Sequence, residues 1–300
     1  MRLTQMKYRV SLDFIGAGKA AEAYGGKLDA WSFIDIEPQE WFEQFRSKIA
    51  ANLGKSYLPV YRMADGEYRF LIGRKFNPHR RPLIKECLGY LADKTGLRDS
   101  ARCSTSWGES YNPKDLKKLK LEYISALQQI ASEGFLGLYL NDNGLNAFTE
   151  YNQSIMPFFE RANIELNLNN YIPFHFVCHL LSGTGWEFFY QNRKILIVTN
   201  LNHQKCQQIE HNLLELGVTS VQFIGISATK SMQDKIDCST VERPDLCLVA
   251  GGIGAANIIN QLKPLQTVVL DIGGFMNCIQ NLSLAIHGGV FKLPKVGIHD

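Results

Sequence analysis

From residue 194 onward, short runs of mostly aliphatic residues alternate with segments that have the pattern of helices. Runs that are apolar throughout are typical of strands buried on both faces of a sheet. The alternation of such strands with helices predicts a parallel, doubly wound sheet. We therefore expect an α/β fold with a Rossmann-like, mostly parallel sheet. The four expected strands are Lys194–Thr199, Ser220–Ile226, Leu246–Ala250 and Thr267–Leu270.

An earlier apolar run, Leu58–Tyr61, is followed by Arg62 and then by Asp65-Gly66-Glu67 at the start of a helix-like segment. Open α/β sheets bind their ligands at the carboxyl ends of strands, where these residues are expected to lie. Two carboxylates suit Mg²⁺ or Mn²⁺ holding a diphosphate. Gly66 allows close approach of the backbone to a ligand, and Arg62 supplies a fixed positive charge. The alternative is structural, because acidic residues also cap and stabilise a helix N-terminus.

The Arg62-x-x-Asp65-Gly66-Glu67 motif after an apolar strand resembles the GT-D-type glycosyltransferases, which are bacterial enzymes. A second resemblance lies near the other end, where a glycine-rich turn after residues 245–250 precedes a helix and the strand that ends in Asp271-Ile-Gly273. The resemblance implies that Asp65 and Glu67 hold the metal ion and the nucleotide sugar. The sequence departs from the family at residues 63–64, which are Met-Ala instead of an aromatic residue and glycine.

Three further polar side chains are candidates for the same site. Asp142 follows the expected strand Phe135–Leu140 and is a candidate general base for the acceptor hydroxyl, a candidate metal ligand, or simply a turn residue. Arg74 belongs to a basic, proline-containing segment, and Lys230 follows another expected strand. Both are expected to share the negative charge of a diphosphate. For the segment of Arg74, the alternatives are an anionic acceptor or a lipid headgroup as the ligand, or a solvated loop without a ligand.

The glycine-rich turn after the strand at residues 246–250 has two possible roles. Gly251, Gly252 and Gly254 precede a helix, so their N–H groups are candidates for cradling a phosphate. The same glycines would equally allow a strand and a helix to pack closely. Asp271, at the end of the last expected strand, is a candidate for binding a hydroxyl or for capping.

The N-terminal residues contain a near match to a dinucleotide-binding fingerprint. Gly16–Ala21 follow a strand-like run, and Asp35 ends a second one, which would place Asp35 on a ribose hydroxyl of NAD(P). Only about ten residues are left for the intervening helix, fewer than a βαβ unit needs, so a structural arm or hairpin is favoured. We expect residues 1–55 to form an N-terminal appendage of an arm and a helix over Pro38–Leu53. Residues 56–300 are expected to form the GT-D-like domain.

Two histidines give a weaker metal signal. An expected helix over Ile172–Leu181 places His175 and His179 four residues apart on one face, a spacing found in zinc sites. No further ligand is evident nearby, so a packed helix is the favoured interpretation.

Composition excludes several classes of function and location. A formal net charge of +3 is too small to indicate nucleic-acid binding. The seven cysteines are scattered without a Cys-x-x-Cys pair, which favours reduced thiols in the cytoplasm. There is neither a signal-peptide pattern at the start nor an apolar run of ~18 residues that would predict a transmembrane helix. Peripheral membrane contact and homo-oligomer formation are left open.

The sequence thus predicts a metal-assisted glycosyltransferase that uses Mn²⁺ or Mg²⁺. The donor is expected to be a nucleotide-diphosphate sugar, with a UDP-sugar favoured, and the acceptor a glycan, glycoprotein or lipid-linked molecule. One alternative is an NAD(P)-dependent oxidoreductase that uses the Gly16–Ala21 turn. Another is a non-catalytic subunit of a surface-polysaccharide assembly.

Overall fold

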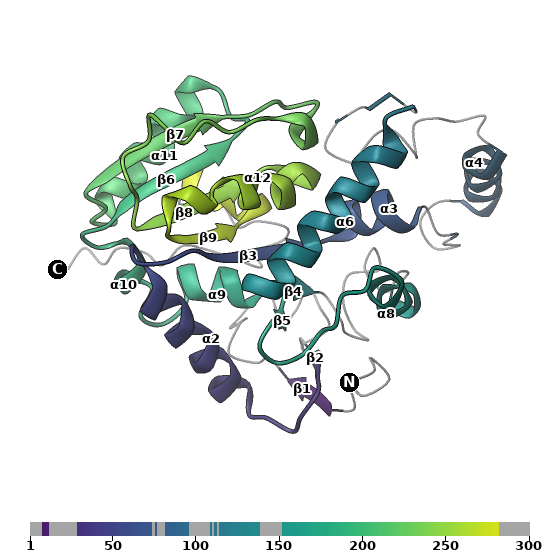
Figure 1. The fold of residues 1–300 in the computed structure, drawn as a ribbon, viewed down its shortest axis with the longest axis horizontal. Helices are drawn as coiled ribbons and strands as arrows, with labels where there is room; N and C mark the ends of the chain where they lie inside the picture. The colour runs from purple at the N-terminus through teal and green to yellow at the C-terminus, as the bar shows by residue number, and fades with distance from the viewer. Residues whose placement is uncertain are drawn as a thin grey trace.

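The computed structural model describes residues 8–11, 29–73, 76, 82–95, 109, 111–112, 114–138 and 152–281. Within these residues, seven parallel strands form one sheet in the order β5-β4-β3-β9-β8-β6-β7 (Figure 1). The expected α/β fold with a Rossmann-like parallel sheet is therefore confirmed. The strands are β3 (Leu58–Met63), β4 (Phe135–Leu138), β5 (Tyr171–Pro173), β6 (Lys194–Thr199), β7 (Ser220–Gly225), β8 (Leu246–Ala250) and β9 (Val268–Asp271).

The middle of the sheet is formed by β3 and β9, which pair directly although they are about 200 residues apart in the sequence. Every residue of these two strands is buried, which explains why they are apolar without alternation except at Arg62 and Asp271. Because all seven strands run in the same direction, their carboxyl ends lie at one edge of the sheet. The segments that follow β3, β8 and β9, which carry most of the predicted site residues, therefore lie along that edge.

Helices cover the sheet on both faces. On one face, α6 and α12 pack against each other and against β3 (Figure 1). The right-handed crossover rule places α11, which connects β6 to β7 in the opposite direction along the sheet, on the other face.

The helices are α2 (Pro38–Asn52), α3 (Asp65–Ile72), α4 (Leu83–Thr95), α6 (Leu116–Glu133), α8 (Asn152–Arg161), α9 (Phe176–Ser182), α10 (Glu187–Tyr190), α11 (His203–Glu215), α12 (Ala255–Gln261) and α13 (Met276–Gln280), with 3-10 turns η3 (Ser231–Gln233), η4 (Gly252–Gly254), η5 (Lys263–Leu265) and η6 (Gly273–Phe275). None of the helices in the described ranges is long and apolar enough to cross a bilayer.

The N-terminal strands β1 (Tyr8–Ser11) and β2 (Asp29–Ser32) pair with each other in antiparallel fashion and form a separate two-stranded sheet. A dinucleotide fingerprint requires a parallel βαβ unit, so these two strands match the hairpin alternative instead. Gly16–Ala21 lie outside the described residues. The hairpin is tied to the main sheet by a hydrogen bond from the Tyr171 hydroxyl to the Trp31 carbonyl, 2.8 Å long.

Helix α2 joins this N-terminal part to the core of the sheet. It begins with proline in its first turn, as expected, and buries Trp41, Phe42 and Phe45. The Trp41 and Phe42 rings make edge-on contacts with Tyr171 of β5 and Phe176 of α9, at centroid distances of 5.4–5.6 Å. The N-terminal helix and the sheet thus share one hydrophobic core.

The expected helix over Ile172–Leu181 is wrong at its start. Residues Tyr171–Pro173 form strand β5, and helix α9 begins only at Phe176, after His175. A buried three-residue strand followed by a buried helix gives one continuous apolar run, and such a run does not distinguish the two. Burial lowers the pKa of His175 to about 3, with Arg62 adding to the shift, and lowers the pKa of His179 to about 4. Among the described residues, no group of three or more His, Cys, Asp or Glu side chains could hold a metal ion.

Candidate active site

The candidate site lies at the carboxyl end of β3, where helix α3 begins at Asp65. Helix α3 contacts the glycine turn η4, and η4 contacts η3, which directly follows Lys230. The fold therefore brings together three segments that are far apart in the sequence and that each carry predicted site residues: the start of α3, the glycine turn η4 and the residues around Lys230. Two other predicted site residues, Arg74 and Asp142, lie outside the described residues.

Glu67 caps the helix in which it lies. Its Oε2 atom accepts a hydrogen bond from the backbone N–H of Ala64, at 2.8 Å, and its side chain is only 6% exposed. This is the reciprocal half of a capping box, which favours Glu or Gln at the third helical position. Glu67 thus has the capping role that is the structural alternative for this motif. It does not exclude a ligand role, because a carboxylate has two oxygens and several acceptor positions. Asp65 occupies the first helical position, and its side chain is not among the described groups.

A pair of buried tyrosines lies near this carboxylate. The hydroxyls of Tyr61, on β3, and Tyr123, on α6, are hydrogen-bonded to each other, and both residues are completely buried. Burial raises the pKa of both hydroxyls, and the negative charges of Glu67 and Asp271 raise it further. Both carboxylates therefore disfavour ionisation of the same pair of hydroxyls, and the segment after β3 and the end of β9 lie near each other because these two strands pair.

Arg62 and Asp271 join the ends of these two central strands. The Arg62 backbone N–H donates to Asp271 Oδ2 at 3.2 Å, and Arg62 Nε donates to the Asp271 carbonyl at 2.8 Å. The other Asp271 oxygen accepts from the Gly273 N–H at 3.1 Å. Burial raises the pKa of Asp271 to about 6, against the opposing effect of Arg62 and the two backbone donors.

The guanidinium of Arg62 is itself only 5% exposed. It donates through NH1 to Cys178 Sγ at 3.0 Å and lies 4.7 Å from the centre of the Phe174 ring. Gly137 faces Arg62 across the β3–β4 pair, and a Cβ at that position would lie 3.0 Å from Arg62 Cγ. Arg62 therefore joins β3, β9 and the β5–α9 segment, and its predicted role toward a phosphate stays a prediction.

The glycine turn after β8 is packed tightly. The Gly254 N–H donates to Ser231 Oγ at 3.0 Å, and a Cβ on Gly254 would collide with the Ser231 backbone and hydroxyl. A Cβ on Gly251 would approach Ile258 Cδ1 at 2.9 Å. Gly252 has a φ of 54°, in the left-handed region that favours glycine. Close packing, one of the two roles considered for this turn, thus accounts for Gly251 and Gly254. No contact bears on the phosphate role.

Sequence reasoning missed one charged residue at this edge. Glu109 is buried, and its Oε1 atom accepts hydrogen bonds from the Ser231 hydroxyl and, at 3.2 Å, from the Ser231 N–H. The Tyr111 hydroxyl donates to the same atom at 3.4 Å and accepts from the Met232 N–H at 3.1 Å. Glu109 thus fixes η3, and through Ser231 also η4. No local signal identifies it, because Ser231, the partner through which it holds η3, lies 122 residues away in the sequence.

Lys230 is exposed at the start of η3, where its own N–H donates to Ser227 Oγ at 3.0 Å. Its ammonium group is on the solvent side of the turn that Glu109 holds. Its predicted role toward a diphosphate stays a prediction.

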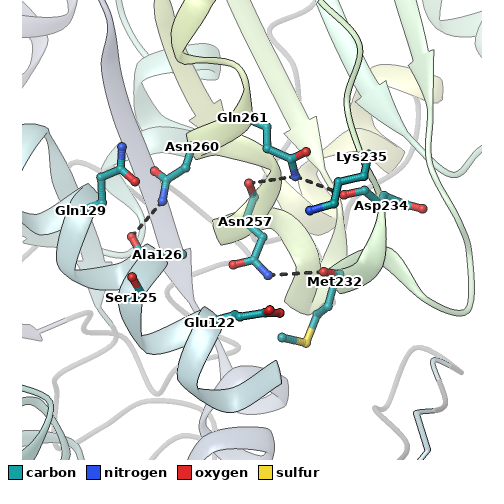
Figure 2. Close-up of a pocket in the computed structure, with 10 residues that line it drawn as sticks. All are labelled: Glu122, Ser125, Ala126, Gln129, Met232, Asp234, Lys235, Asn257, Asn260 and Gln261. Atoms are coloured by element: carbon teal, nitrogen blue, oxygen red, sulfur yellow. Dashed lines mark hydrogen bonds between the residues drawn. The ribbon is translucent and has the colours of Figure 1, made fainter. Parts of the chain in front are cut away.

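A pocket of about 300 Å³ lies beside this site, between α6, α12 and the segment after η3 (Figure 2). None of the predicted site residues lines it. Its amides bridge the surrounding elements: Asn260 donates to the Ala126 carbonyl at 3.2 Å, and Gln261 donates to the Asp234 carbonyl at 3.1 Å. Asn257 donates to the Met232 carbonyl at 3.4 Å (Figure 2). These bonds hold α12 to α6 and η3, so we assign the pocket a structural role.

Comparisons with known proteins identify one group of similar structures. No protein-family model matches the chain. No curated protein matches it either. Two solved structures are similar. One, titled "The highly conserved domain of unknown function 1792 has a distinct glycosyltransferase fold", has 13% identity and a TM-score of 0.43, over 76% of this chain and 81% of that chain. The other, a selenomethionine-substituted structure of domain of unknown function 1792, has 14% identity and a TM-score of 0.39, over 78% and 82%.

These titles describe the family that the Arg62-x-x-Asp65-Gly66-Glu67 motif resembles. At TM-scores this low, the likeness by itself says nothing about the activity of this chain. The functional proposal below therefore starts from the position and contacts of the chain's own residues.

Proposed function

We propose that the protein is a glycosyltransferase that takes its sugar from a nucleotide-diphosphate sugar, with a UDP-sugar favoured. One observation carries this proposal: the Arg62-x-x-Asp65-Gly66-Glu67 motif lies at the carboxyl end of the central strand of a parallel sheet, where such sheets bind ligands. The fold also brings a glycine turn and the Arg62–Asp271 pair to the same edge. The acceptor is proposed to be a glycan, a glycoprotein or a lipid-linked molecule.

The donor set fits a Mg²⁺ or Mn²⁺ ion bound together with a diphosphate. Such ions are usually held by one or two carboxylates plus phosphate oxygens and water, rather than by a complete protein cage. Asp65 and Glu67 would supply these carboxylates. When bound, the ion would neutralise charge on the diphosphate leaving group.

The chain's own groups would have distinct roles in the transfer. The acceptor hydroxyl forms a new bond to the anomeric carbon, the bond from that carbon to the diphosphate breaks, and the hydroxyl proton passes to a base. We propose Asp142 as this base and Lys230 and Arg74 as cations that attract the diphosphate. Asp271 holds Arg62 and the turn at Gly273 in place, so we propose it as a positioning residue.

Thermal stabilisation by ligands tests this proposal. UDP, GDP, CDP and NAD⁺ are each added with and without Mn²⁺ to the wild type, to the Asp65→Ala/Glu67→Gln variant and to Glu160→Gln, an exposed control carboxylate on α8. A ligand at a hundred times its dissociation constant adds ~2.7 kcal/mol of stability. We expect one nucleoside diphosphate to raise the melting temperature of the wild type and of Glu160→Gln in the presence of Mn²⁺. The Asp65→Ala/Glu67→Gln variant should lose this rise.

The other outcomes contradict the proposal in different ways. A shift with NAD⁺ alone would favour the oxidoreductase alternative. No shift with any ligand would favour a non-catalytic subunit. A rise in melting temperature with a nucleotide that depends neither on Mn²⁺ nor on the two carboxylates would show that Asp65 and Glu67 do not take part in nucleotide binding.

A further inference from the structure

Helix α4 has an unusual orientation relative to the rest of the protein. Four aliphatic side chains on it are more than half exposed: Leu83 (57%), Ile84 (75%), Leu88 (63%) and Leu91 (57%). In contrast, Glu86 on the same helix is completely buried. A surface helix of a globular protein normally turns its apolar stripe toward the core and its charges toward water. In α4 the four aliphatic side chains face water and the Glu86 carboxylate is buried, while Lys85 is exposed.

The four exposed side chains form one stripe. At 100° per residue, Ile84, Leu88 and Leu91 fall within about 60° of one another on the helix surface, and Leu83 extends the stripe on one side. Glu86 lies on the opposite side of the helix. The stripe from Leu83 to Leu91 is ~12 Å long. A contiguous apolar surface of this kind marks a contact with something other than water.

The sequence that leads into the stripe is basic, and Lys85, on α4 itself, is exposed. Residues 74–85 contain five Lys or Arg residues and no Asp or Glu. Phe76, which lies within this basic segment, contacts Tyr90 of α4 edge to face, with ring centroids 5.7 Å apart. Phe76 is itself 41% exposed. The described part of the basic segment is therefore packed on α4, and it adds an aromatic side chain to the exposed apolar surface.

We propose that α4 is an interfacial helix that binds the protein to an anionic lipid bilayer. The stripe would enter the boundary between headgroups and acyl chains, while the basic residues next to it attract acidic headgroups. A second copy of the chain is a poorer fit, because stable protein–protein interfaces bury ~800 Å² on each partner and four half-exposed aliphatic side chains provide only part of that. The stretch of positive charge also repels its own copy.

The position of α4 gives this contact a consequence for the site. In Figure 1, α4 lies at the periphery of the molecule beyond α3, on the side toward which β3 runs. A bilayer bound at α4 would therefore lie on the same side of the sheet as Asp65 and Glu67. The inference itself does not depend on the proposed transferase activity, since it stands on exposure and charge alone.

Vesicle flotation of the full chain tests the proposal. Vesicles of phosphatidylcholine alone are compared with vesicles in which about one-third of the lipid is phosphatidylglycerol, a mixture rich enough to attract a basic segment. The test variant is Ile84→Ser/Leu88→Ser. The control is Leu121→Ser/Leu214→Ser, which removes two exposed leucines (60% and 46%) from α6 and α11. All four positions are exposed, so melting curves should show that both variants fold.

We expect the wild type and the control to float with anionic vesicles and to be released by added salt. The Ile84→Ser/Leu88→Ser variant should partition at least roughly tenfold more weakly, because each aliphatic side chain contributes to burial in the acyl region. The proposal is overturned if the wild type ignores anionic vesicles or if the variant binds as well as the wild type. It is also overturned if the wild type does not bind vesicles but forms a dimer in light scattering, and if Ile84→Ser/Leu88→Ser makes this dimer dissociate. A second copy of the chain would then cover the stripe.

Discussion

Substitutions of Glu67 should separate its structural role from its proposed ligand role. In Glu67→Ala, the Ala64 N–H loses its 2.8 Å partner, and this hydrogen bond is partly buried. An unsatisfied buried donor costs about 1–3 kcal/mol, and the loss of a helix cap about 0.5–2 kcal/mol. These two figures describe the same partly buried bond, so we expect a loss of about 1–2 kcal/mol in the free energy of unfolding. Glu67→Gln keeps an oxygen that can accept this bond and should cost less than about 1 kcal/mol.

Urea unfolding at neutral pH, followed by circular dichroism, measures both effects, with Glu160→Gln as an exposed control. The transferase proposal adds a second expectation, that Glu67→Gln loses Mn²⁺-dependent nucleotide binding although it stays as stable as the wild type. Equal stability of Glu67→Ala and the wild type would refute the capping account. Normal metal and nucleotide binding by Glu67→Gln would refute the ligand role.

Three further predictions concern the neighbouring contacts. Arg62→Ala should lower the free energy of unfolding by about 3–5 kcal/mol in urea titrations, because it leaves the buried Asp271 carboxylate without its charged neighbour. Burial raises the pKa of Asp271 from 3.8 to about 6, so the folded state favours the protonated acid. The stability of the wild type relative to Asp271→Asn should therefore fall, by on the order of 3 kcal/mol, as pH rises from about 4 to about 6; a difference that is flat with pH would contradict this. Gly254→Ala should cost about 1–3 kcal/mol in a thermal melt because its Cβ would meet Ser231, whereas Gly225→Ala, with no atom within 4 Å, should be tolerated.

The sequence predicted the parts of the fold in which local pattern and burial agree. The strands Lys194–Thr199 and Leu246–Ala250 were predicted with the bounds they have in the structure, because fully buried strands of a parallel sheet are apolar at every position. Strand β5 was missed, since its three buried residues run into the apolar helix α9 and carry no period of their own. The parallel direction of β3 and β9 was predictable. That these two strands are neighbours was not, because they lie about 200 residues apart and no local pattern indicates which strands pair.

The candidate site was predictable in its position more than in its contacts. The order strand, Arg62, Asp65-Gly66-Glu67 placed the motif at the carboxyl edge, because parallel strands all end there. Glu109 could not be found in this way. Its role depends on hydrogen bonds from Ser231, which only the tertiary fold brings near. The exposure of the aliphatic stripe of α4 was equally hidden, since an amphipathic sequence does not say which of its faces meets the core.

Donor cleavage tests the central claim most directly. The wild type and Glu67→Gln are incubated with UDP-, GDP- and CDP-linked sugars in the presence of Mn²⁺, and the release of nucleoside diphosphate is measured. The account predicts release from one class of donor by the wild type, dependent on Mn²⁺, and its loss in Glu67→Gln at unchanged melting temperature. Release that is equally fast in Glu67→Gln, or a wild type that binds and cleaves none of these donors, would contradict it.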